Sequence, residues 1–353
     1  MPNVLTLCKA QGLKEILGKA IKEKVFPGAI VMYGNEKSKI SVSMGYLSYD
    51  CETRARTEVY YDIASITKIC TVTAILMLVS ERKLCLDDKI RNILDGGDFF
   101  SNITVRQLAG HTSGLRLSLS SLRDKNKIQI TREILLASPL TEPGKVTYYS
   151  DQGYCVLGMI IEKIEGKKLD EVFREKIFSP LNITATFNPI RDFYPVKIAP
   201  TENCKWRNLL LKGEIHDEAA WRMEISGHAG LFCTAIDLFK LGVFWLSEGR
   251  PFIHPEIFSE SIKFPLVANA TKHNDIYGLG WRLSDKRFNG KFISNKTISM
   301  EGFTGPSLMV DLEKGLVVVI MNNHIHPRRK NLEELEKRAL VHQKITEEIY
   351  KII

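Results

Sequence analysis

The chain has 353 residues, of which 44% are hydrophobic and 25% are charged, and its formal net charge is +8. This is the composition of an ordinary globular protein, and the length suggests two core units or one large domain with an insertion. The basic residues are scattered and no zinc-finger or RNA-binding signature accompanies them, so we interpret them as solvated surface and expect no nucleic-acid partner. No apolar stretch reaches the ~18 residues of a transmembrane helix, so we expect no membrane span.

The cysteines and the N-terminus bear on the cellular compartment. The seven cysteines form no C-x-x-C pair and several lie in apolar runs, which favours a reducing compartment over a disulfide framework. Residues 1–20 lack a basic segment followed by a long apolar core, so we interpret them as a helix and not as a signal peptide. We therefore expect a cytoplasmic protein.

The N-terminal part of the chain predicts one helix followed by two strands. The strands are expected at 28–34 and 39–50. In the second strand Ile40, Val42 and Met44 alternate with serines, which predicts one buried face. The apolar face of the helix is formed by Leu13, Ile16, Leu17, Ala20 and Ile21.

The C-terminal part mirrors this order. Residues 307–323 predict two strands joined by a hairpin at 313–315, and a last helix should follow Asn331. Glu334, three residues after that asparagine, resembles the second member of a capping box. The candidates for the apolar face of this helix are Leu332, Leu335 and Ile345.

The middle of the chain is richer in helical patterns than either end, and we interpret it as an inserted helical domain. Strands from both ends are expected to share one antiparallel sheet, with the terminal helices on one face. The predicted fold is therefore of the α/β (α+β) type, with a sheet domain formed by 1–65 and 241–353 and a mostly helical domain formed by 66–240. The active site is expected in the cleft between the two domains.

One apolar segment carries an unexpected charge. Residues 69–79 are almost wholly apolar, as in a helix buried on all sides, yet Lys68 precedes them, one turn after Ser65. Ser and Lys three apart share a helix face, and burial lowers the pKa of a lysine, so its amine can take the serine's proton. Unpaired backbone N–H groups at a helix N-terminus can also stabilise an oxyanion. Ser80 and Lys83 repeat the spacing, so the pattern alone leaves open an N-capping Ser65 with a solvated Lys68.

Several longer segments resemble one superfamily. They are YYDIASITK (60–68), LAGHTSGL (108–115), EPGKVTYYSDQGYCVLGMIIEKIEG (142–166), GEIHDEAAWRMEISGHAGLF (213–232), GLGW (278–281) and EGFTGPSLMVD (301–311). Together they resemble the serine β-lactamase and penicillin-binding-protein superfamily over about residues 10–350, and most of all class C β-lactamases with their esterase-like and D-peptidase relatives. The resemblance implies a sheet domain from both termini with a helical domain inserted, in agreement with the pattern above.

The resemblance also implies roles for residues. Ser65 corresponds to the acylated nucleophile, Lys68 to its proton partner, and Tyr149 to the tyrosine that moves the proton to the leaving group and later activates water. That chemistry needs a lowered phenol pKa, which nearby ammonium groups could supply. The backbone N–H groups of Ser65 and Phe303 would hold the oxyanion. A tyrosine that only packs before a helix is the alternative for Tyr149.

Two positions depart from the family pattern. Asp151 stands where the family usually has Asn, and an ionised Asp only accepts hydrogen bonds, so it either holds Lys68 charged or is an altered substrate contact. Met300, Glu301 and Gly302 stand where the family has Lys-Thr-Gly or His-Thr-Gly. Gly302 still lets the strand approach the substrate, whereas Met300 cannot make a charge-assisted bond and an inward Glu301 would repel a carboxylate. Acyl transfer is expected to survive, with weaker affinity for anionic substrates.

Several histidines are weaker candidates. His216 and Asp217 resemble a Gly-Val-His-Asp stretch of the esterase-like branch, and they either line the cleft or form a structural hydrogen-bond pair. His228 lies in a Gly-His-Ala-Gly turn, where a site role and a structural role are both open, and His111 is interpreted as satisfying its loop backbone. The His-Ile-His segment at 324–326 lacks a third ligand, so we expect no metal site. The sequence has no phosphate-binding glycine loop, and we expect no cofactor.

These residues favour a serine hydrolase, β-lactamase-like in class, that forms an acyl-enzyme on a small-molecule amide or ester. A carboxylesterase acting on neutral esters is a close alternative. It is supported by the missing signal peptide and by the change at residues 300–302, which stand in the place of the family's third motif. A non-hydrolytic descendant that binds a ligand or penicillin in the old cleft is the alternative of another class, supported by Asp151, Met300 and Glu301. Nothing in the sequence indicates an oligomeric state.

Overall fold

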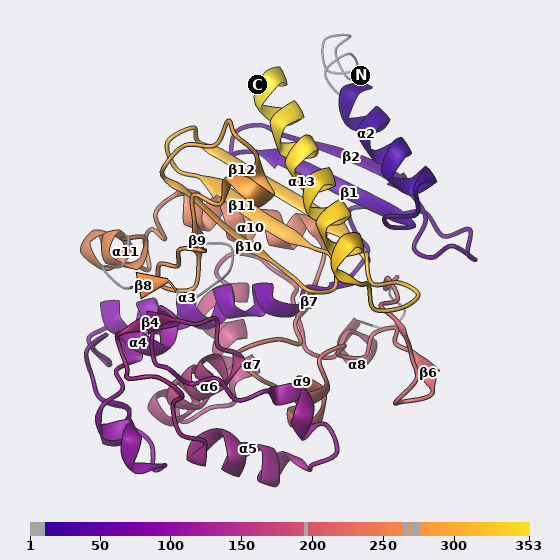
Figure 1. Cartoon of the computed structure of the whole chain (residues 1–353). Helices are drawn as coiled ribbons and strands as arrows, with labels where there is room; N and C mark the ends of the chain where they lie inside the picture. The colour runs from indigo at the N-terminus through magenta and orange to yellow at the C-terminus, as the bar shows by residue number, and fades with distance from the viewer. Residues whose placement is uncertain (1–10, 194–196, 264–267, 270–274) are drawn as a thin grey trace.

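The computed structural model describes residues 11–193, 197–263, 268–269 and 275–353. In Figure 1 they form a sheet part and a mostly helical part, one above the other. The sheet part has six strands in the order β2-β1-β12-β11-β10-β9, each antiparallel to its neighbours. These strands are β1 (Gly28–Gly34), β2 (Lys39–Gly45), β9 (Arg282–Leu283), β10 (Thr297–Glu301), β11 (Ser307–Asp311) and β12 (Leu316–Asn322).

The sheet joins the two ends of the chain, as the sequence predicts. β1 pairs with β12 in antiparallel register, so that Val31 lies opposite Ile320. Both side chains point to one face of the sheet, where α2 (Gln11–Lys22) and α13 (Leu332–Ile352) lie side by side. The alternate residues of the same strands face the other side, which α10 (Ala235–Leu246) covers.

The predicted C-terminal hairpin and capped last helix are confirmed. β11 and β12 pair around a turn in which Gly315 has a φ of +64°, and Asn331 caps α13 in a capping box with Glu334. The second N-terminal strand is shorter than expected. It ends at Gly45, whose φ of +80° takes the chain out of the extended conformation.

Two expected apolar faces are only partly right. Val42 is buried, but Ile40 is half-buried and Met44 is exposed, because β2 is the edge strand and has a neighbour on one side only. On α13, Ile345 is fully buried, whereas Leu332 at the first position of the helix is exposed. Helical periodicity therefore identified the face of α13 but not where along the helix its burial begins.

The helical part lies between β2 and α10 in the chain. Its short paired strands are β3 (Tyr61–Asp62) with β7 (Phe232–Cys233), β4 (Val146–Thr147) with β8 (Ala268–Asn269), and β5 (Asn203–Cys204) with β6 (Leu209–Leu210). The helices and helical turns between β2 and α10 are η1 (Ala64–Ile66), α3 (Thr67–Ser80), η2 (Ile90–Asn92), η3 (Asp98–Ser101), α4 (Val105–Ala109), η4 (Leu119–Leu122), α5 (Lys127–Leu136), α6 (Asp151–Glu165), α7 (Leu169–Phe173), η5 (Arg174–Phe178), α8 (Pro189–Phe193) and α9 (Glu218–Met223). Two helices follow α10 in the chain: α11 (Pro255–Ser261), and α12 (Lys286–Asn289), which packs against α13.

The position of α3 explains why its sequence is apolar on every face. Every residue of the helix except Val79 is buried, because α6, α7 and α11 pack around it. Lys68, in its first turn, is therefore surrounded by protein. Among the described residues, no helix combines the length and apolarity that crossing a membrane requires.

The boundary of the inserted part needs adjustment. α10 begins at Ala235 and packs against β1, β11 and β12, so a division after residue 240 would cut through this helix. We propose that the sheet domain resumes at Ala235, and that the rest of the division predicted from the sequence describes the two parts.

Candidate active site

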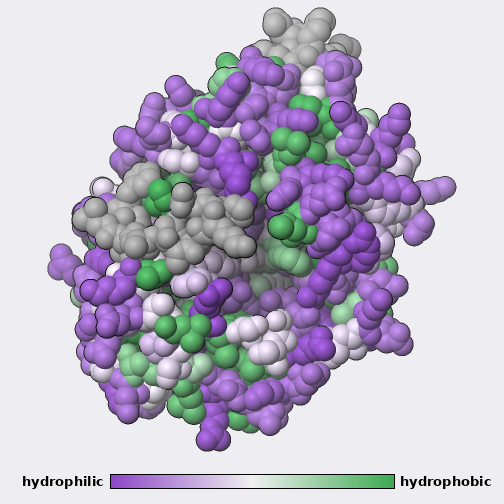
Figure 2. Space-filling model, in the orientation of Figure 1, coloured by the Kyte–Doolittle hydropathy of each residue, from purple (hydrophilic) through white to green (hydrophobic). Residues whose placement is uncertain are grey.

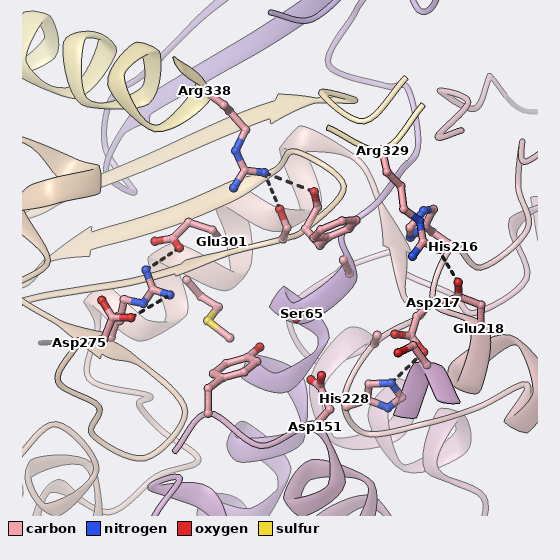
Figure 3. A pocket seen from close by; sticks show the side chains of 18 of the residues that line it. Ser65, Asp151, His216, Asp217, Glu218, His228, Asp275, Glu301, Arg329 and Arg338 are labelled. Carbon is pink, nitrogen blue, oxygen red and sulfur yellow. Dashed lines mark hydrogen bonds and ion pairs between the residues drawn. The ribbon is translucent and has the colours of Figure 1, made fainter. Parts of the chain in front are cut away.

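A cleft of about 490 Å³ is lined by residues of both the sheet part and the helical part. Figure 2 shows a hollow near the centre of a largely hydrophilic face, and Figure 3 shows side chains converging on the pocket. Lys68 lies fully buried beneath the cleft. The residues that the sequence predicts for the site and that line the cleft are Ser65, Tyr149, Asp151, His216, His228, Met300, Glu301, Gly302 and Phe303.

Ser65 and Lys68 lie where a 3-10 turn passes into an α-helix. Ser65 lies in the 3-10 turn η1, directly before α3, and Lys68 follows in the first turn of α3. Lys68 Nζ donates to Ser65 Oγ at 3.1 Å and to the carbonyl oxygen of His228 at 2.8 Å. It also forms an ion pair with Asp151 Oδ1 at 2.7 Å. These three partners use all three N–H donors of the ammonium group.

The ion pair of Lys68 and Asp151 is charged on both sides. Burial by itself would lower the pKa of Lys68, but Asp151 and Tyr149 outweigh it and raise this pKa above its ordinary value. Burial would raise the pKa of Asp151, but Lys68 and His228 outweigh it and lower this pKa. The neutral amine suggested by the apolar sequence is therefore replaced by an ammonium, which agrees with the alternative that Asp151 holds Lys68 charged.

Tyr149 lies beside this ion pair, two residues before the start of α6. Lys68 Nζ is 4.8 Å from the centroid of its ring. Burial raises the pKa of the phenol above its ordinary value and outweighs the opposing Lys68 charge, so the lowered pKa expected from the sequence is not found. The ring packs against His111 with centroids 4.7 Å apart. Burial lowers the pKa of His111 to about 3, so its neutral Nδ1 accepts from the backbone N–H of Ser150 at 3.0 Å, the loop-backbone contact predicted for it.

Asp62, which the sequence analysis did not single out, organises the backbone before Ser65. Its Oδ1 accepts from the N–H of Ala64 at 2.8 Å and its Oδ2 accepts from the N–H of His216, also at 2.8 Å. Ala64 has a φ of +45°, a left-handed conformation that costs energy for a residue with a Cβ. The signal was present in the sequence, since a carboxylate between the apolar Tyr61 and Ile63 must find buried partners.

The third-motif segment, residues 300–302, lies at the edge of the cleft, where β10 ends. Met300 is buried, and Glu301 forms an ion pair with Arg282 at 2.8 Å. A Cβ on Gly302 would lie 2.5 Å from the carbonyl oxygen of Ile63, so a glycine is required for the strand end to approach η1 this closely. Because Arg282 partly neutralises Glu301, this carboxylate repels an anion less than an unpaired inward-pointing one would.

Two backbone N–H groups face the cleft near the nucleophile. Within the described ranges, neither the N–H of Ser65 nor that of Phe303 has a hydrogen-bond acceptor. The segment around Phe303 is fixed by Thr304, whose hydroxyl donates to the carbonyl oxygen of Asp62 at 2.6 Å.

His228 is held on both ring nitrogens. Its Nε2 lies 3.0 Å from Asp217 Oδ1, and its Nδ1 lies 2.7 Å from Ser226 Oγ. Burial would lower the pKa of His228, but Cys155 and Asp217 outweigh it and raise the pKa well above its ordinary value. His228 and Asp217 thus form a second ion pair in the floor of the cleft, and Figure 3 shows it close to Asp151.

His216 takes a different place from its neighbour Asp217. Its ring stacks on that of Phe303, with centroids 5.6 Å apart, and its Nε2 lies 3.4 Å from Glu202 Oε2. The pairing of His216 with Asp217 that the sequence left open is not formed, since Asp217 binds His228 and caps α9. In the part of the chain that the structure describes, no three His, Cys, Asp or Glu side chains are placed to hold a metal ion.

Comparison with known proteins identifies the family. The Beta-lactamase family model matches residues 13–343. The chain belongs to the Beta-lactamase family. A relative from Escherichia coli K12, named putative D-alanyl-D-alanine carboxypeptidase, is 31% identical over 311 residues, which cover 77% of this chain and 71% of the relative. A relative from Bacillus subtilis 168, named N-acetylmuramyl-L-alanine amidase, is 29% identical over 85% of this chain and 78% of its own length.

Solved structures of other proteins share the fold. EstCE1, described as a hydrolase with promiscuous acyltransferase activity, superposes with a TM-score of 0.79 and 18% identity, over 99% of this chain and 100% of its own. A penicillin-binding protein homologue from Pyrococcus abyssi superposes with a TM-score of 0.71 and 21% identity, over 88% of this chain and 72% of its own. The superfamily and the fold class predicted from the sequence are therefore confirmed, and the relatives support a hydrolase.

This Beta-lactamase family member lines its cleft with three arginines that the sequence analysis did not single out. Arg338 of α13 donates to the carbonyl oxygen of Gly302 at 2.9 Å, and Arg329 pairs with Glu218 at 2.5 Å. Arg282 is the partner of Glu301 described above. Arg338 is remote in sequence from the motifs and shows no local pattern, so only the packing of α13 against the sheet reveals it.

Proposed function

We propose that the protein is a serine hydrolase that forms an acyl-enzyme through Ser65. One observation carries the proposal: Ser65 Oγ lies 3.1 Å from the buried Lys68 Nζ in the cleft, with Tyr149 beside both. A serine hydroxyl becomes an effective nucleophile only when a neighbour takes its proton, and the cleft gives a carbonyl carbon access to it. The names of the relatives, a carboxypeptidase and an amidase, support hydrolysis of an amide or an ester.

In this proposal the proton of Ser65 moves through Tyr149. Lys68 is held as an ammonium by Asp151, so it has no lone pair to accept the proton. Its charge opposes the rise that burial causes in the pKa of Tyr149, so it stabilises the phenolate that accepts the proton beside Ser65. As Ser65 Oγ bonds to the carbonyl carbon, its proton passes to the phenolate oxygen and then to the leaving group. Water later attacks the acyl carbon and gives a proton to Tyr149. The bond between that carbon and Ser65 Oγ then breaks, and Tyr149 returns the proton to Ser65 Oγ as the acid is released.

The negative charge that develops on the carbonyl oxygen is stabilised by the backbone. The N–H groups of Ser65 and Phe303 donate to it, and both are held ready by the surrounding hydrogen bonds. Removal of one such donor in other enzymes costs about 10²–10³ in rate, so this pair supplies a substantial part of the acceleration.

The third-motif residues favour a carboxylesterase acting on esters that lack a carboxylate. Met300 offers no cation, and the Glu301 carboxylate is paired with Arg282. β-Lactams and D-alanyl-D-alanine peptides both carry a carboxylate, and Met300 offers that carboxylate no cationic partner. Hydrolysis of β-lactams or of related peptides is the second candidate, supported by the family and by Arg338, a cation beside the end of β10.

Covalent labelling separates these functions. The protein and its Ser65→Ala variant are incubated with a fluorophosphonate and with a fluorescent penicillin, and any adduct is mapped by mass spectrometry. An adduct on Ser65 from the fluorophosphonate alone supports the esterase, and adducts from both reagents support a penicillin-recognising enzyme. No adduct from either reagent would overturn the proposal in favour of a non-hydrolytic descendant. Rates of p-nitrophenyl ester and nitrocefin hydrolysis complete the comparison.

The cysteines bear on the proposed cellular location. All the cysteines that the structure describes are unpaired thiols, and most of them are buried. This supports our proposal of a reducing compartment, such as the cytoplasm.

A further inference from the structure

Two ion pairs meet in the floor of the cleft with the same orientation. In the first, the Lys68 side chain is 0% exposed and that of Asp151 is 39% exposed. In the second, the His228 side chain is 1% exposed and that of Asp217 is 32% exposed. Each pair therefore buries its cation and turns its carboxylate toward the cleft, and Figure 3 shows Asp151, Asp217 and His228 close together below Ser65.

Because both ion pairs have this orientation, the floor of the cleft has a polarity, with its negative side toward the ligand, although the two pairs have no net charge. Each pair is neutral as a whole, but a ligand in the cleft contacts the negative end. Burial would raise the pKa of Asp217, but His228 outweighs it and lowers the pKa, and Asp151 behaves in the same way beside Lys68. Both carboxylates are thus ionised at neutral pH, in a partly enclosed site where screening by solvent is weaker than on an open surface.

Two of the three arginines of the cleft wall are paired with carboxylates and therefore offset this polarity less than unpaired cations would. The third, Arg338, is buried at the end of β10. Arg282 binds Glu301 at 2.8 Å and Asp285 at 3.0 Å. Arg329 is held by Glu218 and by a second carboxylate, that of Glu202. Arg338 donates to the carbonyl oxygens at the end of β10.

At position 300, where the family carries a cation, this chain has none. Met300 is buried at the place where the family carries Lys or His. A carboxylate bound over Ser65 therefore meets no lysine or histidine from β10, whereas an ammonium meets two carboxylates.

We infer that the cleft selects substrates carrying a positively charged group, such as an alkylammonium, which Asp151 and Asp217 bind beside the nucleophile. This rests on the proposed acyl-enzyme function and adds the charge class of its substrate. Asp151 is one hydrogen-bonded step from Ser65, since Lys68 contacts both, so an ammonium on a short flexible chain can reach it while the carbonyl lies over Ser65. Charge-assisted hydrogen bonds of this kind are among the strong ones in proteins.

A matched series of esters tests the inference. The p-nitrophenyl esters of 6-aminohexanoic acid, heptanoic acid and adipic acid present a cation, a methyl group and an anion at the end of similar chains. We expect kcat/KM to fall in that order, with the cationic ester at least about tenfold above the neutral one at low ionic strength. The measure is the cation-to-neutral ratio within one protein, which cancels changes in the chemical step.

Variants locate the effect. Asp217→Asn keeps a side chain that caps α9, and Asp151→Asn is nearly isosteric, so each should lower the ratio about threefold or more. Asp98→Asn is the control, because it makes the same charge change on a fully exposed side chain of η3 and should leave the ratio as it is. A ratio near one in the parent protein, with the neutral ester hydrolysed through Ser65, overturns the inference and leaves the proposed function intact. No hydrolysis of any of the esters overturns both.

Discussion

Replacing Asp151 by Asn should move the reactivity of Ser65 toward lower pH. The Asp151 carboxylate lies 2.7 Å from Lys68 Nζ, and the Lys68 side chain has no exposed surface. An opposite charge at such a distance shifts a pKa by about 1–3 units, or about 1.4–4 kcal/mol at 1.36 kcal/mol per unit. Without the carboxylate, the main group that opposes burial is lost and the pKa of Lys68 falls, so a neutral amine that can accept the Ser65 proton is populated at lower pH.

The same direction follows if Tyr149 is the proton acceptor. The other titratable groups near Lys68 include Tyr149, Tyr154, His111 and Asp217, and all of them remain in the variant. An ammonium no longer screened by Asp151 lowers the phenol pKa of Tyr149, which also populates the acceptor form earlier. An unpaired buried charge would cost about 3–5 kcal/mol of stability, and deprotonation of Lys68 limits that loss.

The assay is the second-order rate of fluorophosphonate labelling of Ser65 between pH 6 and 10. This reagent carries no carboxylate, so the rate reports the nucleophile and not anion binding. We expect the alkaline rise of the Asp151→Asn variant to lie about 1–3 units below that of the parent protein. A rise at unchanged or higher pH, in a variant whose circular dichroism and Tm match the parent, would refute the assignment of Asp151 as the group that keeps Lys68 charged. Asp98→Asn again supplies the matched control.

Three further substitutions test the edge of the cleft. Gly302→Ala should slow labelling of Ser65 by about 10²-fold, because the added Cβ, 2.5 Å from the Ile63 carbonyl oxygen, displaces the end of β10. Arg282→Met should lower the free energy of unfolding in urea by about 3–5 kcal/mol, because it leaves the buried carboxylate of Glu301 without its main partner. The double substitution Met300→Lys with Glu301→Thr restores the family triplet and should increase the rate of acylation by fluorescent penicillin, measured by gel fluorescence.

Each of these substitutions has a control or a contrary outcome that separates the stated cause from a general loss of folding. Phe303→Ala keeps the backbone N–H, so it should retain most labelling, and a loss equal to that of Gly302→Ala would contradict the backbone argument. Arg282→Met combined with Glu301→Met should recover part of the stability, since Glu301 no longer leaves a buried charge unpaired, while Asp285 keeps only its longer contact with Arg287. If the Lys-Thr variant reacts with penicillin no faster than the parent, carboxylate recognition is limited elsewhere in the cleft.

Much of the fold could be read from local patterns. The apolar segments 28–34 and 316–322 predicted two central strands, and the apolar run after Lys68 predicted a helix surrounded by protein. The patterns were less reliable at edges. Met44 and Leu332 have the right periodicity but lie where the neighbouring layer ends, and periodicity carries no information about the extent of the neighbour.

The residues that the motifs predict for the site also lie together at one cleft. Ser65, Lys68 and Tyr149 are separated by up to 84 positions but are in contact in the structure. Arg338 and Asp62 were missed for different reasons. Arg338 belongs to a helix whose sequence pattern is that of any amphipathic helix, whereas Asp62 lay inside a quoted motif and needed only the question of where a buried carboxylate finds its donors.

The sequence by itself determined which side chains this protein can use: a serine and a lysine one turn apart in an apolar helix, a tyrosine before a second helix, and a third motif without its cation. The tertiary structure alone decided their charges, because a pKa depends on distances between groups that the chain order does not specify. Asp151 makes Lys68 an ammonium, and Arg282 partly neutralises Glu301. Tertiary packing also set the direction of the two ion pairs in the floor, and with it the negative face that a substrate meets.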